Sequence, residues 1–151
     1  MSANSPAETQ QLTVTERAER QRAVVQALGR VLPADAILYT PEDTTPYECD
    51  GLTAYRERPL VVALPETEAQ VQAVLKACHA LQVPVVARGA GTGLSGGAMP
   101  HRLGVTLSMA RFNQIKTVDP VSRTAVVQCG VRNLAISCLL YTSPSPRDAH
   151  E

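Results

Sequence analysis

The sequence lacks the features of several classes of binding protein. Tryptophan is absent from this 151-residue chain, and phenylalanine occurs once. An aromatic platform for stacking nucleic-acid bases is therefore not expected. Charge of one sign is not in excess either, because 14 Lys and Arg residues balance 14 Asp and Glu residues. Proteins that bind nucleic acids or membrane surfaces usually carry a basic excess, so we expect no nucleic-acid partner.

Long apolar runs and metal-binding spacings are also missing. No apolar run approaches the roughly 20 residues that span a membrane. The N-terminus, MSANSPAETQQ, has no basic start followed by an apolar stretch, which predicts no secretory signal. Cys49, Cys78, Cys129 and Cys138 form no C-x-x-C pair, and no histidine stands at zinc-ligand spacing. We therefore expect reduced, packed thiols in a cytoplasmic protein without a metal site.

Apolar residues make up 44% of the chain, enough to bury a core in one domain. Residues 1–12 are polar and are expected to fray. Thr13 and Glu16 have the spacing of a capping box, and an apolar stripe continues from there to Val31, which predicts a helix. Residues 33–59 are rich in proline and predict irregular structure, with a short strand at 36–39. We assign residues 1–35 to a polar tail and helix that precede the main domain.

A strand, a helix and a strand follow in quick succession. Residues 60–64 (LVVAL) and 83–87 (VPVVA) are short apolar runs, typical of strands buried on both faces. Between them, Thr67 and Gln70 form a second capping-box pattern before an apolar face of Val71, Val74, Leu75, Cys78 and Leu81. This βαβ unit predicts two parallel strands. The runs at 105–109, 115–118 and 124–128 have tight links and predict antiparallel pairing. The fold class is therefore α+β, and a helix can begin at 132–137.

The most informative segment is a glycine-rich loop after the second strand. Residues 88–98 read RGAGTGLSGGA and hold five of the nine glycines of the chain. Glycine lets a ligand approach the main chain closely, and successive N–H groups can converge on an anion. Thr92 and Ser95 add hydroxyl donors. The loop therefore predicts a site for a phosphate or pyrophosphate group.

The residues alone leave the kind of phosphate site open. Gly91, Gly93 and Gly96 form a G-x-G-x-x-G pattern, but a Rossmann site also needs a helix directly after it. Gly97 and Pro100 disfavour that helix, and no acidic residue stands in the expected place about 20 positions on. A P-loop is excluded because no Gly-Lys-Ser/Thr follows. A purely structural glycine turn remains the alternative.

The segment RPLVVALPETEAQVQAVLKACHALQVPVVARGAGTGLSGGA resembles the flavin-binding domain of FAD-linked oxidases of the vanillyl-alcohol oxidase type. PYECDGLTAYRERPL before it and MARFNQIKTVDPVSRTAVVQCGVRNLAIS after it follow the same pattern, so the likeness covers about residues 36–137. The resemblance implies an N-terminal part of an FAD-binding domain over 36–137. It places the FAD pyrophosphate on the loop, with Arg88, Gly89, Ala90, Gly91, Thr92, Gly93, Ser95, Gly96 and Gly97 as the binding residues.

Within this family, the sequence is similar to flavin subunits of 2-hydroxyacid oxidases. That likeness implies oxidation of glycolate to glyoxylate, with D-lactate as a further substrate. It also implies sibling subunits, one of them an iron–sulfur protein, which would place the protein in the cytoplasm or at the inner face of the membrane. The catalytic histidines and carboxylate-binding arginines of the family would lie outside these residues, so no catalytic residue is assigned here.

Several other side chains carry weaker expectations. Arg88 can pair with the pyrophosphate or point into solvent. His79 is expected on a helix surface and His101 in a solvated turn. Asp50 and Tyr55 lie in a family-like segment without an assigned role, and a functional thiol at Cys129 is not expected.

The resemblance stops after Ser137. The remaining residues, CLLYTSPSPRDAHE, contain two prolines and no periodicity. We interpret 138–151 as a non-native tail that arose by reading through a sequencing adapter. Two further hypotheses for the chain follow: an inactive truncated stub that does not bind FAD, or a stand-alone nucleotide-binding module.

Overall fold

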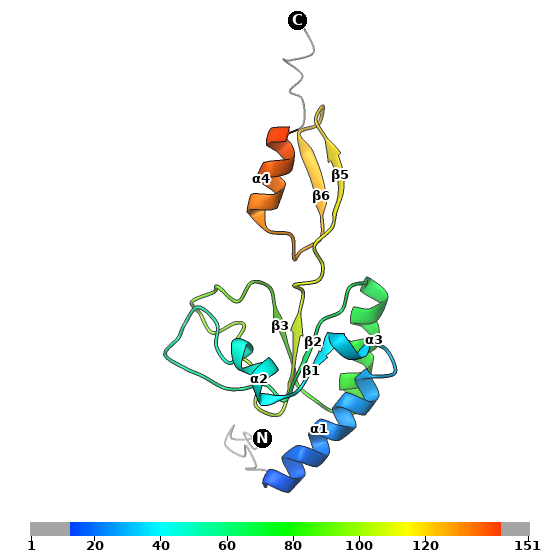
Figure 1. Cartoon of the computed structure of the whole chain (residues 1–151), viewed down its shortest axis with the longest axis vertical. Helices are drawn as coiled ribbons and strands as arrows, with labels where there is room; N and C mark the ends of the chain where they lie inside the picture. The colour runs from blue at the N-terminus through cyan, green and yellow to red at the C-terminus, as the bar shows by residue number, and fades with distance from the viewer. Residues whose placement is uncertain (1–12, 143–151) are drawn as a thin grey trace, which may run out of the picture.

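The computed structural model describes residues 13–142 and contains two separate groups of strands (Figure 1). The predicted polar stretch 1–12 and residues 143–151 of the predicted tail lie outside the described residues. In chain order the elements are α1 (Val14–Leu28), η1 (Ala34–Ala36), β1 (Ile37–Leu38), α2 (Pro41–Thr44), η2 (Thr45–Tyr47), β2 (Val61–Ala63), α3 (Glu68–Ala80), β3 (Val85–Arg88), β4 (Val105–Ser108), β5 (Ile115–Asp119), β6 (Thr124–Val127) and α4 (Asn133–Thr142).

The first group is a four-stranded sheet in the order β1-β2-β4-β3. β2 and β3 both run parallel to β4, so the predicted parallel relation is confirmed, but β4 lies between them. The prediction that residues 105–109 pair antiparallel is wrong. Parallel neighbours need a long crossover, and the glycine-rich segment 89–104 supplies it without a helix.

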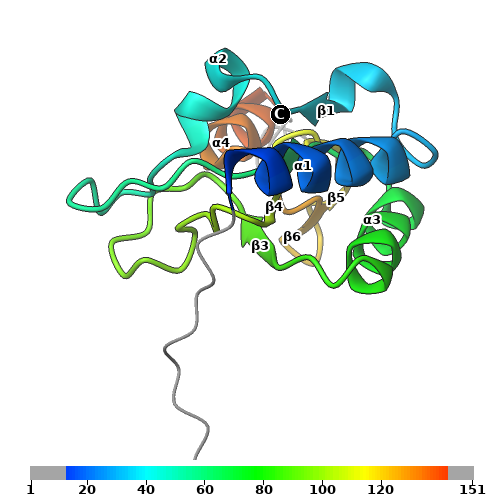
Figure 2. The same cartoon turned by 90° about the horizontal axis from the view of Figure 1, so that it is seen from below.

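The core lies between this sheet and two helices. α1 lies beside α3 (Figure 2) and also packs on β2. It contributes Val24 and Leu28 to the same buried cluster as β2 and β4. Both predicted capping boxes are confirmed: Thr13 pairs with Glu16 at the start of α1, and Thr67 pairs with Gln70 at the start of α3.

The predicted apolar face of α3 is only partly buried. Val74 and Cys78 are in the core, whereas Leu75 is 44% exposed and Leu81 is 39% exposed. The expectation that the strand at 83–87 is buried on both faces is also wrong. β3 ends the sheet order of the described residues, and its side chains are half-buried or exposed.

The second group is an antiparallel hairpin of β5 and β6 followed by α4, and it stands apart from the four-stranded sheet (Figure 1). The antiparallel pairing of these two strands confirms the prediction. The predicted helix start at 132–137 is confirmed as well, and α4 continues to Thr142, past the predicted boundary at 137.

The cysteines differ in their surroundings. Cys78 is buried and Cys49 is half-buried, but Cys129 and Cys138 are exposed, which corrects the expectation of packed thiols for these two. Burial raises the pKa of the Cys78 thiol. Within residues 13–142 there is no cluster of metal-ligating side chains, and no helix has the length and apolar character to cross a membrane.

Candidate functional site

The glycine-rich loop begins where β3 ends, at the carboxyl edge of the parallel strands. Ligands of open α/β sheets bind at this edge. Gly91 has a φ of +70° and Gly96 a φ of +76°, both in the left-handed region that favours glycine. The sequence therefore folds here into a path that side-chain-bearing residues would adopt only under strain.

The amides of this loop lack protein partners among the described residues, although the Gly96 carbonyl accepts from the Met99 amide at 3.1 Å. Within the part of the chain that the structure describes, the amides of residues 90–97 donate no hydrogen bond to protein atoms. At Gly89, Gly93 and Gly97, no atom outside the glycine and its two sequence neighbours lies within 4 Å of the position that a Cβ would occupy. The hydroxyls of the exposed residues Thr92 and Ser95 point to no partner among the described residues. The loop thus offers free N–H and O–H donors on an open cradle, which is the donor set that suits a pyrophosphate.

A cavity of about 480 Å³ opens beside the start of the loop. The carboxyl ends of β3 and β4 form one wall, and the turn into α4 forms the other, so the cavity lies between the two groups of strands. Its lining consists of Tyr47, Arg88, Gly89, Ala90, Ser108, Met109, Ala110, Cys129, Gly130, Val131, Arg132 and Asn133.

The structure separates the predicted site residues into two sets. Arg88, Gly89 and Ala90 line the cavity, whereas residues 91–97 continue outward along the exposed loop. Sequence reasoning missed both the β4 end at 108–110 and the turn at 131–133. The first could have been found by placing β4 in the parallel sheet, since the ends of parallel strands meet at one edge.

The charge of the cavity lining suits an anion. Arg88 and Arg132 are its only charged side chains, and the lining that the structure describes contains no carboxylate and no histidine. Arginine presents a fixed fork of N–H donors that matches phosphate oxygens.

The Arg88 side chain lies against the segment that contains Tyr47 and Cys49. Its Nη1 donates a 2.7 Å hydrogen bond to the carbonyl of Cys49. Its guanidinium carbon lies 5.5 Å from the centroid of the Tyr47 ring, within the range of a cation–π contact. Of the two alternatives for Arg88, the structure does not show the side chain free in solvent, and pairing with the pyrophosphate stays a prediction.

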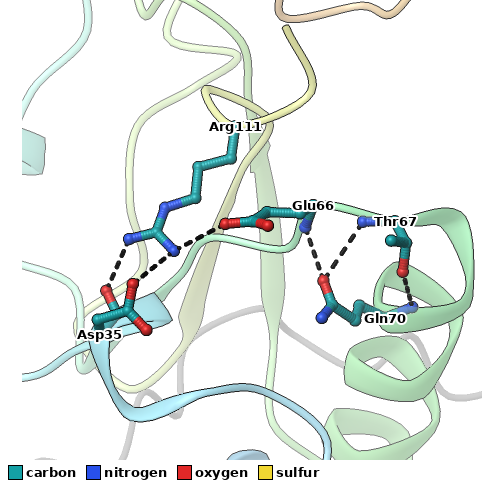
Figure 3. Close-up of polar contacts among 5 residues, drawn as sticks. All are labelled: Asp35, Glu66, Thr67, Gln70 and Arg111. Carbon is teal, nitrogen blue, oxygen red and sulfur yellow. Dashed lines mark hydrogen bonds and ion pairs between the residues drawn. The ribbon is translucent and has the colours of Figure 1, made fainter. Parts of the chain in front are cut away.

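Arg111, in the segment that follows β4, pairs with two carboxylates from earlier parts of the chain (Figure 3). Arg111 Nη1 lies 2.9 Å from Asp35 Oδ2 and 3.1 Å from Glu66 Oε1, and its Nη2 donates to the carbonyl of Asp35 at 2.9 Å. Glu66 stands next to the α3 capping box, where Gln70 Oε1 accepts from the Glu66 and Thr67 amides. One arginine thus connects the segment after β4 with η1 and with the start of α3.

The remaining candidates lie outside the cavity, apart from Cys129. His79 is exposed, as expected, and His101 is half-buried, with its Nδ1 accepting from the Leu103 amide at 3.1 Å. Tyr55 is 67% exposed. Asp50 is 4% exposed, and its Oδ1 accepts from the Leu52 amide at 2.8 Å. The exposed thiol of Cys129 lines the cavity.

Comparisons with known proteins identify the family of the chain. A family model described as an FAD binding domain matches residues 59–142. The glycolate oxidase subunit GlcD of Escherichia coli strain K12 is 57% identical over 129 residues, which are 82% of this chain and 26% of GlcD. A D-2-hydroxyglutarate dehydrogenase of Xanthomonas citri pv. viticola is 36% identical over 107 residues, 71% of this chain and 23% of that enzyme.

Solved structures share the fold. A substrate-bound p-cresol methylhydroxylase superposes with a TM-score of 0.72 at 25% identity, over 82% of this chain and 25% of that chain. An alkyldihydroxyacetonephosphate synthase superposes with a TM-score of 0.69 at 20% identity, over 80% of this chain and 24% of that chain. The chain spans about a quarter of the length of these relatives. With the family model covering more than half of its residues, the chain belongs to the FAD-binding domain family, and its cofactor is FAD.

Proposed function

We propose that the chain holds the pyrophosphate of FAD on the main chain of residues 89–97, with Thr92 and Ser95 as hydroxyl donors. The observation that carries this proposal is the set of loop amides without a protein partner among the described residues. The positions of a Cβ at Gly89, Gly93 and Gly97 are also empty. A cradle of this kind accepts an anion without displacing any protein hydrogen bond. Arg88 and Arg132 add positive charge beside it.

We further propose that the chain serves as the FAD-binding part of a 2-hydroxyacid oxidoreductase that converts glycolate to glyoxylate, with D-lactate as a second substrate. The names of the similar proteins support this substrate class. Bound FAD would supply the chemistry by accepting a hydride from the substrate carbon. By the same likeness, sibling subunits including an iron–sulfur protein would take the electrons, in the cytoplasm or at the inner face of the membrane.

A second candidate is a chain that does not retain FAD alone. The observation that favours it is apolar surface on the second group of strands, where Val126 is 56% exposed and Leu134 is 73% exposed. Such surface normally packs against further protein. The two candidates differ in a directly measurable property, the affinity of the chain for FAD.

The test is calorimetric titration of the chain with FAD, ADP and FMN. FAD and ADP contain a pyrophosphate, whereas FMN contains a flavin and one phosphate. We expect FAD and ADP to bind and FMN to bind at least tenfold more weakly. Equal binding of FMN, or no binding of FAD, would contradict the proposal.

Turnover is a separate question. A base must take the hydroxyl proton when a 2-hydroxyacid is oxidised. The described lining of the cavity contains no histidine and no carboxylate. We therefore expect no glycolate-dependent dye reduction by the FAD-loaded chain alone, and measurable reduction would show a base that lies outside this lining.

A further inference from the structure

A short segment that is far from the glycine loop in sequence packs against it in the structure. Residues 47–52 contact the loop at three places, two of them at its first residue, Arg88. Arg88 Nη1 bonds the Cys49 carbonyl at 2.7 Å, and the Arg88 guanidinium stands over the Tyr47 ring. Gly51 meets the loop farther along: a Cβ there would lie 2.6 Å from the Thr92 carbonyl oxygen and 2.9 Å from that of Gly93.

The segment itself is held in a fixed turn. Asp50 is buried, and its Oδ1 accepts from the Leu52 amide, which closes a turn around Gly51. Its other oxygen, Oδ2, is buried without a hydrogen-bond partner in the described part of the chain. A buried carboxylate oxygen without a partner is costly, so the rest of the fold must hold this turn in place.

The loop in turn wraps around Arg88. A Cβ at Gly91 would overlap with the Arg88 guanidinium. The guanidinium therefore fills the space between the Tyr47 ring and the Gly91 main chain. An arginine in this position links residues 47–49 to a loop that makes no main-chain hydrogen bonds of its own between residues 90 and 95 within the described chain.

We propose that residues 47–52 form a brace that gives the glycine loop its shape before FAD binds, with Arg88 and Gly51 as its positioning residues. The ligand in this inference rests on the proposed function. A loop of five glycines otherwise samples many conformations, and binding would have to order them. A brace that orders the loop in advance raises the affinity for FAD, because less conformational entropy is lost on binding. Gly51 would act in this way without touching FAD itself.

The test combines backbone ¹⁵N relaxation with FAD titration in the 151-residue chain. In the unliganded chain, we expect order parameters of about 0.8 for the amides of residues 89–97, typical of rigid backbone. Gly51→Ala and Arg88→Ala should each lower them below about 0.6 and weaken FAD binding at least tenfold. Gly29→Ala, which lies at the end of α1, and Arg30→Ala, an exposed arginine, are the matched controls and should change neither quantity.

Chemical rescue separates positioning from a general loss of structure. Methylguanidinium should occupy the space left in Arg88→Ala and restore both the order parameters and the FAD affinity, whereas methylammonium should not. Unchanged order parameters in both variants would overturn the proposal, as would lowered order parameters with unchanged FAD affinity. If the unaltered chain does not bind FAD, the proposed function fails, and the relaxation data still decide whether the brace exists.

Discussion

Leu28 tests whether α1 is an integral part of the FAD-binding fold. Its side chain is 1% exposed and belongs to the core cluster that contains β2 and β4. Replacing a buried leucine with alanine costs about 2–5 kcal/mol, because apolar contact is lost and a cavity remains. For a chain of this size, a loss of about 3 kcal/mol lowers the Tm by roughly 6–12 °C.

Leu75→Ala is the matched control, since the same substitution is made on a helix where the side chain is 44% exposed. We expect a loss of about 1 kcal/mol there, because roughly half of the transfer free energy of a leucine is at stake. The assay is urea unfolding followed by circular dichroism, which should show one transition for both variants. If Leu28→Ala lost no more stability than Leu75→Ala, α1 would not be part of the core.

Three further predictions concern the site, the Arg111 ion pairs and the start of α1. Alkylation with iodoacetamide, read by mass spectrometry, should label the exposed Cys129 and spare Cys78, whose thiol pKa is raised by burial. FAD should protect Cys129 from the reagent because this thiol lines the cavity. Labelling of Cys129 that FAD does not change would contradict the location of the site. Arg111→Met should cost about 1 kcal/mol in urea unfolding, and 1 M salt should reduce that difference, since its carboxylate partners are 56–70% exposed; a difference independent of salt would contradict an ionic role. Hydrogen bonds from Thr13 lower the pKa of Glu16 below its ordinary 4.5. The stability that the Glu16 carboxylate adds to α1 is therefore present above pH 4.5 and is lost as the pH falls through the lowered pKa. Glu16→Ala should be less stable than the unaltered chain at pH 7 but equal to it in strong acid.

Local signals in the sequence predicted local structure well. The two capping boxes, at Thr13 and Thr67, mark the starts of α1 and α3 because they depend on side chains only three residues apart. The pairing of β4 was not predictable in the same way. A strand between short links is typical of antiparallel pairing, and only the three-dimensional path of the glycine-rich crossover shows that β4 enters between β2 and β3.

The candidate site, too, could be predicted only in part, because most of its lining is brought together by the three-dimensional fold. The loop was evident from its glycines, but the cavity is assembled from Tyr47, the end of β4 and the turn before α4, which are far apart in the chain. Arg88 shows the limit most clearly. Its sequence position suggested a phosphate ligand or a solvated side chain, whereas its guanidinium is bound to the Cys49 carbonyl, a partner 39 positions away.

The measurement that tests the central claim most directly is the FAD affinity of Gly93→Ala. Gly93 has no atom within 4 Å of its Cβ position, and its φ lies outside the left-handed region, so the variant should fold with an unchanged or slightly higher Tm. If the FAD pyrophosphate lies on this stretch of main chain, the added methyl group stands where the ligand must approach. We expect the Kd for FAD to rise at least tenfold relative to the unaltered chain and to Gly29→Ala. An unchanged Kd in a folded Gly93→Ala variant would contradict the assignment of the glycine loop as the FAD site.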